Sequence, residues 1–168
     1  MAFIDDLYSW LVFFHVLGVF VFLLAHGVSA GVGFKLRRER DHVRIAALLD
    51  LSASSYTTMA LGFLWILATG GILGWLGGWW TRAWFWTAII VLFVVTGFMT
   101  PLVATKYNKV RRALGLRVMF QSKRERKAPP PKPEEVPGFP AAARPMLAAG
   151  IGMGGIVIVL WLMMFKPF

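Results

Sequence analysis

Two histidines in a long apolar stretch are the residues of this chain best suited to chemistry. His15 and His26 lie eleven residues apart. On an α-helix this spacing completes three turns to within about 20°, and it separates the two side chains by about 16 Å along the axis. They should therefore share one face. An imidazole can donate a hydrogen bond, carry a proton or ligate iron, so this face is the candidate functional site.

The neighbours of the histidines predict how that helix is turned. The histidine face also carries small, polar or aromatic residues, namely Gly18, Phe22, Ser29 and Gly33. The opposite side carries larger apolar residues, namely Val12, Leu17, Phe20 and Leu24. A polar stripe on an apolar helix turns toward protein, and its apolar side turns toward lipid. We therefore expect His15, His26, Gly18 and Ser29 to line a site inside a helix bundle.

Three hypotheses fit the histidines. Each histidine could hydrogen-bond a threonine or a backbone carbonyl of a neighbouring helix; one or both could ligate a b-type haem; or they could relay protons or contact a quinone. They cannot share one iron, because two trans axial nitrogens lie only about 4 Å apart. Each would need another ligand: His42, Met59 or Met99 for His26, and Met163, Met164 or a second subunit for His15. The same two histidines are also the candidate ligands of a metal ion.

Four apolar blocks must position this site. The chain has 168 residues, of which 58% are hydrophobic and 15% charged. The blocks cover about residues 8–34, 56–78, 84–104 and 146–165, and none of them contains Asp, Glu, Lys or Arg. Each is long enough to cross a hydrocarbon core of about 30 Å. We predict an all-α integral membrane four-helix bundle formed by a single domain, residues 1–168.

The cationic residues predict the orientation of the bundle. Of the 18 Lys and Arg residues, 16 lie in two connections, residues 35–44 and 106–144, and the second of these is also rich in proline. Positive loops stay on the cytoplasmic side, so both termini and the connection at residues 79–82 should face outward in a bacterial cell membrane. Seven tryptophans near the outer ends of the spans fit an interfacial belt, and only Trp65 lies mid-span. We therefore expect the net charge of +10 to attract anionic lipid of the inner leaflet rather than nucleic acid.

Local signals add two further expectations. Asp41 should cap a helix that begins at His42 and either lies in the interface or continues into the second span. Glycines four residues apart allow close helix packing, and they occur in three spans as Gly27 and Gly31, Gly70 and Gly74, and Gly150 and Gly154. We expect these glycines to lie at helix–helix contacts.

The stretch from Phe14 to Val32, followed by the basic exit Lys35 to Asp41, resembles a group of bacterial four-span integral membrane proteins. That group is distantly similar to the membrane part of copper-resistance D-type proteins. The shared mark is an early histidine on the first span, which corresponds to His15 here. The resemblance implies a four-span fold and no particular reaction.

The remaining composition limits the function. The chain has no cysteine, which excludes thiol chemistry, and no phosphate-binding loop or intramembrane carboxylate. We expect a non-catalytic accessory or anchoring subunit of a larger membrane assembly, with a protein partner or a second copy of the chain. The alternative is a b-type haem cytochrome that exchanges electrons with a quinone or a partner through His15 or His26.

Overall fold

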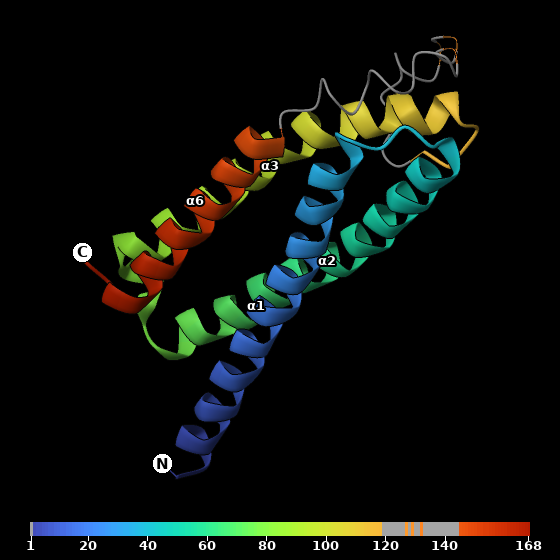
Figure 1. Cartoon of the computed structure of the whole chain (residues 1–168). Coiled ribbons are helices and arrows are strands. Elements are labelled where there is room, and N and C mark those ends of the chain that lie inside the picture. The colour runs from blue at the N-terminus through green and yellow to red at the C-terminus, as the bar shows by residue number, and fades with distance from the viewer. Residues whose placement is uncertain (1, 119–126, 128, 130–131, 133–144) are drawn as a thin grey trace.

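The computed structural model describes residues 2–118, 127, 129, 132 and 145–168, and within them the regular structure is helical. The helices are α1 (Ala2–Leu36), α2 (His42–Leu76), the short 3₁₀ helix η1 (Trp79–Thr81), α3 (Ala83–Ala113) and α6 (Pro145–Phe165). Figure 1 shows their arrangement. The all-α prediction is confirmed. Most of the connection at residues 106–144 beyond α3 lies outside the described residues.

Three helices are long and apolar enough to cross a membrane: α1 over residues 6–36, α2, and α6 from Met146. The apolar part of α3, Ala83–Met99, is shorter. At about 1.5 Å per residue, the 35 residues of α1 or α2 exceed the thickness of a hydrocarbon core. Helix α1 extends beyond the predicted segment 8–34 at both ends, whereas α2 begins well before the predicted segment 56–78 and ends within it, at Leu76.

The start of α2 follows the predicted cap. The Asp41 carboxylate accepts a hydrogen bond from the backbone N–H of Val43 at 2.8 Å. From His42 the helix continues without interruption to Leu76, so the segment after the cap runs on into the second span. It ends at Gly77, and Gly78 follows with a φ of 67°, a left-handed conformation that glycine adopts without strain.

The helices form two pairs, α1 with α2 and α3 with α6, and the contacts between the pairs are fewer. Figure 1 shows α1 crossing α2, with α6 alongside α3. The N-terminus, η1 and the C-terminus lie toward one end of the molecule, and the α1–α2 connection lies toward the other.

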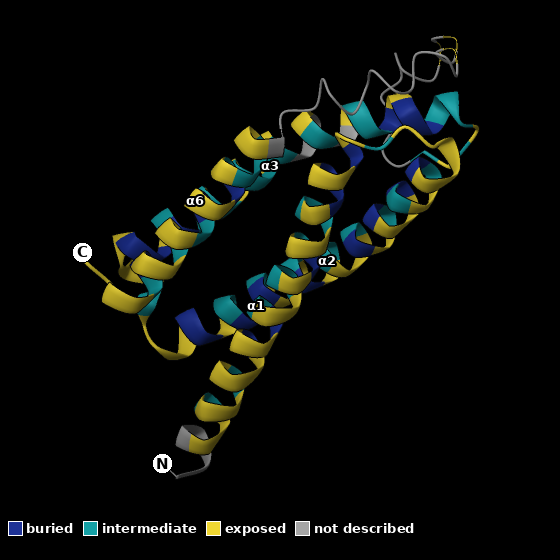
Figure 2. Cartoon of the chain, viewed as in Figure 1, coloured by how far each residue is buried: buried dark blue, intermediate teal, exposed yellow. Residues whose placement is uncertain are grey.

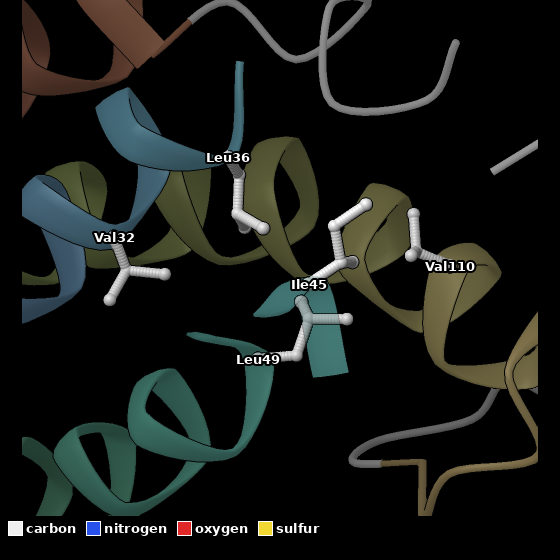
Figure 3. Close-up of a cluster of buried hydrophobic side chains, with 5 residues drawn as sticks. All are labelled: Val32, Leu36, Ile45, Leu49 and Val110. Carbon is white, nitrogen blue, oxygen red and sulfur yellow. The ribbon is translucent and has the colours of Figure 1, made fainter. Parts of the chain in front are cut away.

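Two apolar clusters join the elements. The first apolar cluster, drawn in Figure 3, brings together the end of α1, the start of α2 and the last part of α3 through Val32, Leu36, Ile45, Leu49 and Val110. The second cluster joins the start of α3 to the end of α6 through Trp84, Phe85, Ala88 and Leu162. Elsewhere, large apolar side chains are exposed along every helix. Figure 2 shows exposed positions, in yellow, along the helices. Such a surface is compatible with lipid as the surrounding solvent.

The predicted rotation of α1 is confirmed. His15, Gly18 and Gly33 are buried, and Phe22 and Ser29 are partly buried. The opposite face is exposed, and Leu24 reaches 71% exposure.

Candidate functional site

His15 is buried where α1 packs against α2, and its partner is Thr69. The His15 Nδ1 atom lies 2.8 Å from the Thr69 hydroxyl oxygen. That hydroxyl is also 2.7 Å from the Trp65 carbonyl oxygen, which can only accept. The single hydroxyl hydrogen is therefore used by the carbonyl, so His15 Nδ1–H donates to Thr69. This is the contact with a threonine that the structural hypothesis predicted.

Trp65 belongs to the same hydrogen-bond network, and no role was predicted for it from the sequence. Its indole Nε1–H donates to the Phe14 carbonyl oxygen at 3.0 Å. Its ring also lies so close to Gly18 that a Cβ there would collide with Trp65 Cδ1. The signal for this role was its position, since it is the only tryptophan in the middle of a predicted span.

His15 packs closely against α2. A Cβ on Gly70 would lie 3.1 Å from His15 Cε1, and the absent side chain of Gly18 is replaced by the Trp65 ring. The space beside Gly18 is therefore filled by the Trp65 indole of the same chain and is not open to a macrocycle. Thr69 contacts the imidazole at its Nδ1 atom.

His26 contacts a different pair of helices. Its ring stacks on Phe22, with centroids 6.0 Å apart and planes 15° from parallel. A Cβ on Gly152 of α6 would lie 2.9 Å from both His26 Nε2 and Met99 Sδ. The three residues come from α1, α6 and α3, so His26 marks the junction of the two helix pairs.

The His26 and Met99 side chains have the ligand types of a haem site, but the arrangement does not fit one. Axial ligands stand on opposite faces of a macrocycle. Here the backbone of Gly152 lies against both candidate ligand atoms. Haem ligation thus has no geometric support at either histidine. Although the histidines share a face of α1, they form separate sites, and Ser29 lies about one turn beyond His26 on the same face.

The glycine predictions have a mixed outcome. Gly70 and Gly74 of α2 do pack against other helices: a Cβ on Gly74 would lie 2.6 Å from the Phe85 ring. Four other glycines contact no neighbouring helix within the described residues, where an added Cβ would meet nothing within 4 Å: Gly27, Gly31, Gly150 and Gly154. On α6 the contact face instead uses Gly152 and Gly155, in phase with the buried Leu162.

In the sequence, Arg111 is one of many cations in the basic connection at residues 106–144. In the structure it joins α3 to the start of α2. Its side chain is 5% exposed and forms an ion pair with Asp50 at 3.4 Å. Its guanidinium donates to the Leu49 carbonyl, and to the Arg117 carbonyl at 2.7 Å. Burial lowers the pKa of Arg111, and the Asp50 carboxylate opposes that shift. The sequence offered no signal for this role.

Tyr107 lies beside Arg111 on α3 and packs against the first apolar cluster. Burial raises the pKa of its phenol to about 12. It therefore remains neutral over the physiological range.

The tryptophans at the η1 end of the molecule fit the predicted interfacial belt only in part. Trp84 is 4% exposed and belongs to the second apolar cluster. The indole N–H of Trp86 donates to the Trp80 carbonyl at 2.8 Å, and Lys166 Nζ lies 4.3 Å from the Trp79 ring centroid. These residues therefore tie η1 to the adjoining ends of α3 and α6.

A cavity of about 630 Å³ lies at the other end of α1. Among the described residues, its lining includes Gly31, Phe34, Lys35, Arg37 and Arg38. It combines an apolar part with three cations, and neither histidine contributes to it.

The comparisons with known proteins assign no family. No family model, no curated protein and no solved structure matches this chain.

Proposed function

We propose that this chain is a multi-pass protein of a bacterial cell membrane and serves as an accessory or anchoring subunit of a larger membrane assembly. In this proposal four segments span the bilayer, both termini lie outside, and the basic connections are cytoplasmic. Support comes from the three long apolar helices and from the retention of positive loops on the cytoplasmic side.

The third span of this proposal is the first part of α3. The apolar run in the sequence continues past Met99 to Ala104, which makes it long enough to cross a bilayer. The helix also packs along α6. An even number of spans agrees with the position of both termini toward one end of the molecule (Figure 1).

The observation that carries the accessory role is the open glycine pair on α6. Gly150 and Gly154 are exposed, and no described residue lies within 4 Å of a Cβ added to either. Small residues four apart allow another helix to approach closely in lipid. Exposed apolar side chains flank the pair, including Met153 at 56% and Val157 at 60%. This surface suits a transmembrane helix of a partner protein.

The histidines support the same reading. His15 is held in a network that joins α1 to α2, and His26 lies at the junction of α1, α3 and α6. Both stabilise the bundle that would carry the partner surface.

The test is affinity purification from membranes in mild detergent. We expect a partner to co-purify with the wild-type protein and to be lost from Gly154→Leu. Gly97→Leu is the matched control, because Gly97 is equally open but lies on α3. A wild-type protein that runs alone as a monomer would reject the proposal. A complex made only of this chain would replace the accessory role with self-association.

A further inference from the structure

The cavity at the end of α1 has the size and composition of a ligand site. Its volume of about 630 Å³ falls in the range of about 300–1,000 Å³ typical of small-molecule pockets. Gly31, Phe34 and Lys35 follow the i, i+3, i+4 spacing that places side chains on one side of a helix. Arg37 and Arg38 follow in the turn after Leu36.

The apolar part of the cavity is open. Gly31 has nothing within 4 Å of an added Cβ, and Phe34 is 43% exposed. An extended hydrocarbon chain could lie over Gly31 and against the Phe34 ring. A ligand made only of an anionic group would leave this part uncovered.

The polar part carries excess positive charge. Among the described residues, the ion pairs given by the structure are Arg44 with Asp41 and Arg111 with Asp50, and neither involves a cavity residue. The nearby Glu39 carboxylate is turned toward the backbone, where it accepts from the N–H groups of Arg40 and Asp41. These two backbone hydrogen bonds lower the pKa of Glu39 and keep it ionised on its own loop.

We propose that this cavity binds one anionic phospholipid, with its phosphate at Lys35, Arg37 and Arg38 and an acyl chain over Gly31 and Phe34. Arginine suits phosphate because its guanidinium can donate two parallel hydrogen bonds. The boundary between the apolar and the basic part coincides with the end of the first span, where a headgroup meets its acyl chains. This is a defined site, beyond the general attraction of basic loops to an anionic leaflet.

In the experiment the full chain is placed in phosphatidylcholine nanodiscs, and phosphatidylglycerol is titrated into them. Native mass spectrometry then measures how much phosphatidylglycerol the protein retains. Each cation near an anionic headgroup contributes about fivefold to binding, so Arg37→Gln with Arg38→Gln should weaken retention about 30-fold. The control, Arg40→Gln with Lys109→Gln, removes the same charge outside the cavity and should change retention less than threefold. Equal losses in both double variants would overturn the site.

Two further arms test the lipid itself. Gly31→Leu fills the apolar part and should reduce retention at least tenfold, whereas Gly27→Leu, at an equally open glycine outside the cavity, should not. Glycerol 3-phosphate should not compete at millimolar concentration, and effective competition would identify a phosphate site rather than a lipid site. The arginine variants should leave any partner bound at Gly154 in place, so the two proposals can fail separately.

Discussion

At the scale of single residues, most of the chemistry is devoted to holding helices together. His15 and Trp65 each form a hydrogen bond between α1 and α2. His15 bonds to the Thr69 side-chain hydroxyl, and Trp65 bonds to the Phe14 backbone carbonyl. Inside a bilayer such bonds have no competition from water, although their net contribution to stability is modest. The polarity of the histidine face is therefore explained by packing.

The bond between His15 and Thr69 should be measurable in a double-mutant cycle. We expect His15→Phe and Thr69→Val to be coupled by about 0.6–1.7 kcal/mol of unfolding free energy, measured by SDS titration in mixed micelles. Thr87→Val is the control and should cost almost nothing, because the Thr87 hydroxyl bonds only to its own helix, at Ala83. A coupling indistinguishable from zero would show that His15 is not held by Thr69.

Tyr107 should make stability depend on pH in the alkaline range. Its phenol ionises near pH 10 in the unfolded chain and at about 12 in the folded protein. Between these values only the unfolded state releases the proton, so the folded state loses up to about 3 kcal/mol as the pH rises from 10 to 12. Unfolding measured across this range should show the loss in the wild type and not in Tyr107→Phe. An identical slope in both proteins would place the pH dependence elsewhere.

At the scale of elements, small differences in helix rotation decide which glycines pack. The segment from Gly150 to Gly155 offers several small-residue pairs, and α6 is turned so that Gly152 and Gly155 face inward. The buried Leu162 continues the same face toward α3. The hydropathy of α6 is high on all sides, so it could not indicate this rotation.

Neighbouring glycines on α6 provide a matched test of this rotation. A Cβ on Gly155 would lie 2.5 Å from Val95, a stiff β-branched side chain, so Gly155→Ala should destabilise the protein by about 1–3 kcal/mol. Gly154→Ala adds the same methyl group to an open position and should cost less than about 0.5 kcal/mol. Thermal unfolding in detergent would compare the two variants. The reverse order of stability would mean that α6 is turned the other way.

At the scale of the whole molecule, two helix pairs are joined at few points. His26 and Gly152 connect them within the bundle, and Arg111 and the first apolar cluster connect α3 to the end of α1 and the start of α2. The large exposed apolar surface between and around these points requires lipid or partner helices to cover it.

The absence of cysteine allows the proposed orientation to be tested directly. Arg82→Cys, in the outer connection, should react with a membrane-impermeant maleimide added to intact cells. Arg40→Cys should react only after the cells are opened, and it removes the same charge. Labelling of both positions, or of Arg40→Cys alone, in intact cells would contradict the orientation.

Local patterns in the sequence determined much of this protein. Hydropathy predicted the all-α class and the apolar segments, because a hydrocarbon core demands long uninterrupted apolar helices. The Asp41 cap and the inward face of α1 were also readable, because capping and helical periodicity depend on residues close in the chain.

Only the tertiary structure decided which residues those faces meet. Trp65 fills the space beside Gly18, Gly152 rather than Gly150 lies against His26, and Arg111 is buried against Leu49 and Asp50. These contacts join residues that are far apart in the sequence, and they depend on the crossing and rotation of whole helices. A helix that is apolar on every side has no periodic pattern in its sequence that indicates its rotation. Packing against the other helices alone therefore decides which side faces inward.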